Sequence, residues 1–178
     1  KFGNLKVLNF DMCEFLTEIA DVSDIPNLEE LSCCGCGNLL TVHQSIGFLN
    51  KLKTLRVTSC SKLTSFPRLN STSLESLVLA NCLRLENFPE IVGEMKNLQI
   101  LVLARLRIKE LPVLFQNLVG LQTLNLDNCG IAGFPSSNIG PPERSFLKAS
   151  IVHLELLSRL DISASLPHFH LCKLLSLC

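Results

Sequence analysis

A repeat of 22 to 24 residues runs through the first part of this chain. The unit opens at six leucines spaced by 23, 24, 22, 24 and 23 residues: Leu5, Leu28, Leu52, Leu74, Leu98 and Leu121. Self-similarity at a fixed period of this length is typical of repeat architectures, in which each unit packs on its neighbours. The chain is therefore predicted to fold as a stack of similar coils.

Each unit reads L-x-x-L-x-L-x-x-C-x-x-L-x-x-(F/L/I/V), and proline often follows, as in "LRVTSCSKLTSFP" and "LVLANCLRLENFP". This is the leucine-rich repeat pattern. Leucines at the fourth and sixth positions alternate with other residues, so they share one face of a short strand. The predicted fold class is α/β: a leucine-rich repeat solenoid, curved as a horseshoe arc, with a concave parallel β-sheet and an irregular or short-helical convex side.

Residues on the convex side are expected to close each coil around the core. Proline lacks a backbone donor and so marks the turn onto that side. The prolines are Pro67, Pro89, Pro112 and Pro135, and the apolar convex pairs are Ile46 with Leu49, Ile91 with Met95, and Leu114 with Leu118.

The repeats are predicted to span residues 1–140, and residues 141–178 to form an irregular C-terminal cap or a degenerate repeat. The segment "GPPERSFLKAS" is rich in turn residues, whereas "LSRLDISASLP" resembles one more repeat. Because the chain starts at Lys1 and enters a repeat within five residues, we expect it to be a piece of a longer protein.

Composition favours a neutral, reduced protein. Sixteen basic residues balance sixteen acidic ones, so no overall field would attract nucleic acid or an anionic membrane. The sequence has no apolar run of about 20 residues and no signal peptide. We therefore expect no membrane span, a cytoplasmic location, and nine cysteines in the thiol form.

Cysteine recurs at the ninth position of five repeats, which predicts a structural role. A small, weakly polar side chain fits the turn that leaves each strand. Disulfides between coils are disfavoured because the Cβ vectors of equivalent positions run parallel. Only Cys34, at a seventh position, is expected to face the concave surface. The structural repeat cysteines are Cys13, Cys36, Cys60, Cys82 and Cys129.

Two cysteine clusters could instead bind metal. Cys33 and Cys36 have the C-x-x-C spacing of zinc and redox sites, but both already occupy core positions of a repeat. The tail "HFHLCKLLSLC" carries four donor side chains in a spacing that fits no familiar zinc finger: His168, His170, Cys172 and Cys178. A structural role is preferred for the first cluster, and a degenerate cap for the second.

Motifs that carry enzymatic chemistry are missing. The sequence contains no P-loop, H-E-x-x-H motif or nucleophile elbow, and "GCGNLL" lacks the third glycine of a dinucleotide site. We expect no enzyme activity, and we assign no catalytic residue, cofactor or metal.

The repeat pattern predicts which side chains lie on the concave surface. An acidic pair in the second repeat should lie beside Arg56, and an apolar centre in the fourth and fifth repeats is rimmed by charges. Such a surface suits a protein partner better than a polyanion. The alternative is that its residues are merely solvated sheet residues that pair with one another. The candidate protein-binding residues are Glu29, Glu30, Arg56, Thr58, Val78, Ile100, Val102, Arg105, Asn125 and Asp127.

Three phrases make the resemblance more specific: "VHQSIGFLNKL", "SLESLVLANCLRLENFPEIVGEMKNL" and "IKELP". Together they resemble the repeat region of plant intracellular immune receptors of the TIR-type nucleotide-binding leucine-rich-repeat class, in a form similar to that of legumes. The resemblance covers roughly residues 1–139. Ala20 replaces the proline that usually follows the first "TEI". The TIR domain and the nucleotide-site motifs of that class have no counterpart in this sequence.

The resemblance implies a protein-recognition module in plant defence and signal transduction. It would sense a pathogen effector or a guarded host protein, and in a full-length receptor it would also contact the nucleotide-binding domain. The alternative is an autoregulatory repeat segment that controls an ADP/ATP switch or an NAD-cleaving TIR domain outside this chain. An extracellular receptor ectodomain is disfavoured by the missing signal peptide.

Overall fold

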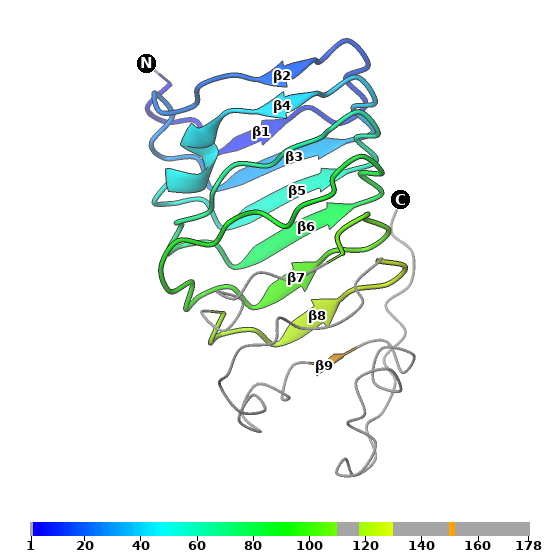
Figure 1. Ribbon diagram of the computed structural model, residues 1–178. Helices are drawn as coiled ribbons and strands as arrows, with labels where there is room; N and C mark the ends of the chain where they lie inside the picture. The colour runs from blue at the N-terminus through cyan, green and yellow to red at the C-terminus, as the bar shows by residue number, and fades with distance from the viewer. Residues whose placement is uncertain (1, 110–117, 130–149, 152–178) are drawn as a thin grey trace.

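The computed structural model describes residues 2–109, 118–129 and 150–151, and within these residues each repeat contributes one strand to a parallel sheet. The strands are stacked in chain order (Figure 1). They are β1 (Val7–Asn9), β3 (Glu30–Cys34), β5 (Thr54–Thr58), β6 (Ser76–Ala80), β7 (Ile100–Val102), β8 (Thr123–Asn125) and β9 (Ser150–Ile151). The predicted leucine-rich repeat solenoid is confirmed.

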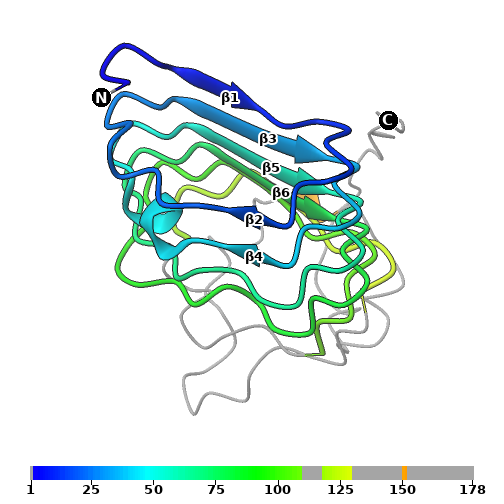
Figure 2. The ribbon, with the colours of Figure 1, turned by 90° about the horizontal axis from the view of Figure 1, so that it is seen from above.

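The opposite side of each coil is mostly irregular. Two-residue strands β2 (Glu18–Ile19) and β4 (Thr41–Val42) pair in parallel there, followed by the 3-10 helix η1 (Gln44–Phe48). Seen from above, β2 and β4 lie across the coil from β1, β3, β5 and β6 (Figure 2). The sequence predicted this irregular, short-helical side.

The strand register places the fourth and sixth residues of successive repeats in line inside the stack. Leu55 pairs with Leu77 and Leu77 with Leu101, and all three side chains are fully buried. The convex pairs Ile46 with Leu49 and Ile91 with Met95 are buried as predicted, whereas Leu114 lies outside the described residues. The alternation of apolar positions thus builds one continuous core.

Two glycines permit neighbouring coils to approach closely. A Cβ atom added to Gly47, within η1, would lie 1.7 Å from the carbonyl oxygen of Arg68. At Gly120, it would lie 1.9 Å from the carbonyl oxygen of Lys96. Because both neighbours are backbone atoms, only the absence of a side chain allows this packing.

The eighth residue of all six described repeats adopts a left-handed backbone conformation. The φ angles are 61° at Met12, 74° at Gly35, 55° at Ser59, 55° at Asn81, 53° at Arg105 and 54° at Asn128. In the first five repeats, the N–H of this residue donates to the seventh carbonyl of the next coil, over 2.7 to 3.0 Å. The turn therefore ends each strand and adds one more hydrogen bond between coils.

The ninth-position cysteines extend this bonding. The thiols of Cys36, Cys60 and Cys82 donate to the sixth-residue carbonyl of the preceding coil, at 2.9, 3.3 and 3.6 Å. Cys129 makes the equivalent bond to Leu103. Burial raises the pKa of Cys36, and a hydrogen bond with Cys82 together with burial raises that of Cys60. The thiols of Cys36 and Cys60 are thus protonated donors at neutral pH.

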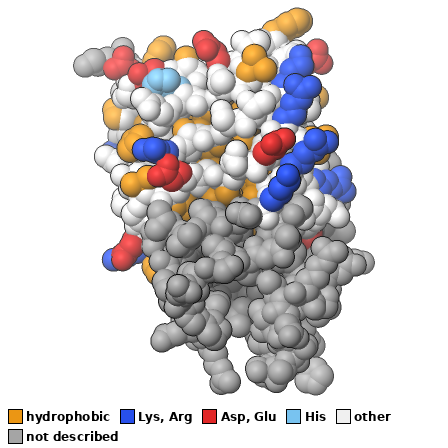
Figure 3. All heavy atoms as spheres, viewed as in Figure 1, with side chains coloured by type: hydrophobic (Ala, Val, Ile, Leu, Met, Phe, Trp, Pro, Cys, Tyr) orange, Lys and Arg blue, Asp and Glu red, His pale blue; other side chains and the backbone are white. Residues whose placement is uncertain are grey.

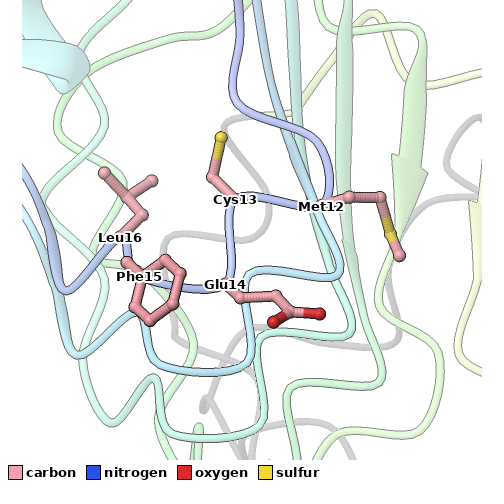
Figure 4. Close-up of a pocket in the computed structure, with 5 residues that line it drawn as sticks. All are labelled: Met12, Cys13, Glu14, Phe15 and Leu16. Atoms are coloured by element: carbon pink, nitrogen blue, oxygen red, sulfur yellow. The ribbon is translucent and has the colours of Figure 1, made fainter.

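Cys13 is the exception among these cysteines. It occupies the first repeat, where the described residues provide no preceding coil, and its side chain is exposed. Figure 4 shows the thiol pointing away from the neighbouring Met12 and Glu14 side chains. The ninth-position cysteines that have a described coil beneath them are buried or half-buried, as a structural role would require.

The C-terminal segment contributes a seventh strand to the sheet. Ser150 and Ile151 of β9 pair with Thr123 and Leu124 of β8. This strand falls within residues 141–178, for which a cap or a degenerate repeat was predicted. The rest of that segment lies outside the described residues.

Candidate protein-binding surface

The outward side of the parallel sheet, here called the strand face, carries the third, fifth and seventh residues of each repeat. It corresponds to the concave surface predicted from the sequence. The register aligns the fifth residues across five coils, and they change from polar to apolar and back: Ser32, Arg56, Val78, Val102 and Asn125. The sheet therefore converts sequence spacing into a surface of defined order.

An apolar patch lies at the middle of the strand face, as predicted. Val78 of β6 is in register with Val102 of β7, and both are half-buried. Ile100, two residues before Val102 on the same side of β7, is 41% exposed. Ala80 continues the patch on β6. Apolar side chains at the centre of a sheet face provide the desolvated contact area that protein interfaces use.

Arg56 borders this apolar patch. It is in register with Val78 on one side and Ser32 on the other, and its side chain is exposed. It forms no ion pair with another described residue. Thr58, on the same strand, is half-buried beside Ala80. Arginine next to an apolar surface can donate to a partner's carboxylate while its stem packs on that surface.

The two glutamates of the second repeat, Glu29 and Glu30, lie in different surroundings. Glu29 accepts from the Nζ atoms of Lys6 and Lys53, at 2.8 and 2.9 Å, and these hydrogen bonds lower its pKa to about 2. It belongs to a charge ladder along the margin of the sheet. Glu30, on β3, is exposed and in register with Thr54. Glu29 is therefore held by lysines, not by Arg56.

At the other end of the face, Asn125 and Asp127 form a local structure. The side-chain oxygen of Asn125 accepts from the backbone N–H of Asp127 over 2.8 Å. Asn9 and Asp11 repeat this arrangement in the first coil, at 2.7 Å. Both residues of the last repeat are half-buried, so they contribute shape as well as polarity to the surface.

One sequence-based placement on this face is wrong. Arg105 is an eighth residue, so its left-handed backbone places it in the turn after β7 rather than on the strand. Cys34, a seventh residue, lies on the predicted side, with its thiol 3.6 Å from the Ser32 hydroxyl, but it is only 9% exposed. The repeat pattern gives the direction of a strand side chain, but neither the backbone twist that follows nor the cover that neighbours provide.

Among the described residues, neither a hollow nor a cluster of metal ligands provides a second candidate site. One hollow, of about 510 Å³, is lined by five consecutive residues of one turn, Met12–Leu16 (Figure 4). The described part of the chain holds no group of three metal-ligating side chains. Cys33 and Cys36 belong to the core, and the donors of the tail, including His168 and His170, lie outside the described residues.

The sequence did not predict one charged feature, a row of Lys and Arg side chains along an edge of the sheet. Figure 3 shows Lys and Arg side chains along the lateral edge at which the strands of Figure 1 end. These residues lie in turns of successive repeats, 22 to 24 residues apart, and their alignment emerges only when the coils are stacked. The chain's balanced net charge gave no sign of it.

Comparison with known proteins supports the repeat assignment. The Leucine Rich Repeat family model matches residues 120–141, which include most of the sixth repeat. The disease resistance protein RPP2A of Arabidopsis thaliana is 36% identical over 126 residues, or 70% of this chain. The TMV resistance protein N of Nicotiana glutinosa is 35% identical over 136 residues, or 75% of the chain. The chain is thus a leucine-rich repeat segment similar to those of plant disease resistance proteins.

This leucine-rich repeat segment is short beside its relatives. The aligned region covers 9% of RPP2A and 12% of the N protein, and a 90-residue match at 44% identity covers 8% of RPP4 of Arabidopsis thaliana. No solved structure matches the chain significantly. Among its described residues, no helix is long and apolar enough to cross a membrane. The resemblance to the repeat region of the TIR-type nucleotide-binding class, indicated by the sequence, is confirmed.

Proposed function

We propose that this segment is the protein-recognition module of an intracellular plant immune receptor, and that it senses a pathogen effector or a guarded host protein. Its strand face is the sensing surface. The observation that carries the proposal is the apolar patch of Val78, Ile100 and Val102 on β6 and β7, bordered by an Arg56 side chain with no ion-pair partner among the described residues.

The chemistry of this patch favours a protein over other ligands. Interfaces between proteins combine an apolar centre with a polar rim, and arginine is enriched among their energetically dominant residues. A polyanion would need several cations on the face, whereas the described fifth residues include only Arg56. The face is also part of a continuous hydrogen-bonded sheet, so binding would require little backbone rearrangement.

The proposal can be tested by proximity labelling in leaf cells infected with a pathogen. The chain is fused to a labelling enzyme, and each labelled protein is then purified and tested for direct binding. The strand-face variant carries Ile100→Asp and Arg56→Glu. A matched control carries Val92→Asp and Lys51→Glu, which introduce the same changes at exposed positions away from that face.

We expect at least one effector or host protein to bind the wild type and the control, but to bind the strand-face variant at least about tenfold more weakly. Equal binding to all three proteins would place recognition elsewhere on the molecule. Loss of binding in the control to the same extent as in the strand-face variant would also contradict the proposal. Circular dichroism of the purified variants verifies that each is folded.

A further inference from the structure

The turns that follow β5, β6 and β7 carry five cations and one carboxylate. The cations, here called the basic turn column, are Lys62, Arg84, Arg105, Arg107 and Lys109, and the carboxylate is Glu86. All five cations are exposed, and none forms an ion pair with another described residue. These turns follow the ends of the strands, the lateral edge along which Figure 3 shows Lys and Arg side chains.

The charge of this edge reverses along the solenoid. The turn after β1 carries Asp11 and Glu14, and the turn after β3, residues 35–40, carries no charge. The turns after β5 and β6 carry one cation each, Lys62 and Arg84, and the turn after β7 carries three. At the opposite edge of the sheet, where the strands begin, Lys53 instead forms an ion pair with Glu29. The chain has zero net charge but concentrates positive charge at one edge, so this edge can attract and orient an acidic partner.

From this edge we infer a second interaction surface, separate from the strand face, that binds an acidic helical segment of a protein. Neighbouring strands lie about 4.8 Å apart, so cations in successive coils repeat at that spacing. Carboxylates three or four residues apart on a helix have Cβ atoms about 5 to 6 Å apart. One face of such a helix can therefore meet Lys62, Arg84 and Arg107 together.

The composition of the column favours protein over nucleic acid. Leu83, beside Arg84, is 51% exposed and offers an apolar contact within the basic surface. The turn segments 59–65, 81–87 and 103–109 contain no aromatic residue, whereas proteins that bind single-stranded nucleic acid stack bases on aromatic rings. A carboxylate-bearing helix with an apolar side chain on the same face suits all these features.

The test uses the whole chain and two labelled peptides in fluorescence anisotropy. One peptide is helical, with glutamates three and four residues apart and a leucine on the same face, and the other has the same composition in scrambled order. Single-stranded RNA of equal charge is the third probe. The column variant is Arg84→Gln with Arg107→Gln. The control, Lys51→Gln with Lys96→Gln, removes the same charge from turns that precede strands.

We expect the helical peptide to bind the wild type more tightly than the scrambled peptide or the RNA, and to weaken as salt is raised. The column variant should bind it about tenfold more weakly, and the control within about twofold of wild type. Substitution of both arginines by lysine should preserve most of the binding.

Three outcomes overturn the inference. Equal or tighter binding of RNA would identify a nucleic-acid surface. Equal loss in the control would reduce the effect to net charge. No peptide binding, or binding that the column variant retains, would leave the edge without this role. A failure of any kind leaves the strand-face proposal intact, because Ile100 and Arg56 are unchanged in these variants.

Discussion

Replacement of Cys82 by alanine should destabilise the chain by about 1 to 2 kcal/mol. The Cys82 side chain is fully buried, and its thiol contacts the carbonyl oxygens of Val57 and Ala80 at 3.6 and 3.5 Å. Loss of one buried methylene-sized group costs about 0.8 kcal/mol in transfer free energy. The cavity left behind and the weak thiol hydrogen bond add about 0.5 kcal/mol each.

Cys13→Ala is the matched control, because it removes the same atom from the same repeat position where the side chain is exposed. Its effect should be within about 0.5 kcal/mol. The assay is urea unfolding of both variants and of the wild type, followed by circular dichroism, with a thermal melt in parallel. For a chain of this length, the Cys82 variant should melt about 2 to 8 °C below wild type.

Equal effects of the two substitutions would refute the reasoning, because the account attributes the difference to the preceding coil. So would a Cys82 variant as stable as the wild type, since it would mean that the thiol neither fills space nor bonds. A reducing agent in all samples removes disulfide exchange as a cause of any difference.

Three further predictions concern packing and charge. Gly47→Ala should cost at least about 2 kcal/mol in urea unfolding, because its Cβ would lie 1.7 Å from a backbone oxygen, whereas Gly37→Ala should be within about 0.5 kcal/mol of wild type. Glu29 should titrate at about 2 by carboxyl NMR; its lowered pKa stabilises the fold above pH 4.5 and the benefit is lost as the pH falls towards 2, and Lys53→Met should raise that pKa. Native labelling with a thiol reagent should modify Cys13 rapidly and Cys82 only after unfolding, and rapid reaction at Cys82 would contradict its burial.

The sequence predicted the stack and its core because both depend on periodicity. An apolar residue such as Leu77 recurs at a spacing that only an inward-facing strand position satisfies, and Cys82 recurs at the turn that follows. The apolar patch around Val102 could be predicted for the same reason, since alternation along a strand determines which face a side chain occupies.

Features that depend on backbone conformation or on side chains from several coils could not be predicted. The turn at Arg105 requires a positive φ. Gly35 and Asn81 at the equivalent position favour that conformation, but a Met or an Arg there gives no sign of it. The partners of Glu29 come from the coils on either side of it, and the reach of lysine side chains decides that ion pair. Exposure of Cys13 depends on which coils are its neighbours, a property outside its own repeat.

The most direct test of recognition at the strand face is hydroxyl-radical footprinting of side chains, with and without a partner identified by proximity labelling. Ile100 is 41% exposed on the strand face, and Phe48 is 50% exposed at the end of η1 on the opposite side. We predict that the partner lowers the oxidation rate of Ile100 several-fold and leaves that of Phe48 unchanged. Unchanged oxidation of Ile100 in the saturated complex, with protection of Phe48, would contradict the account.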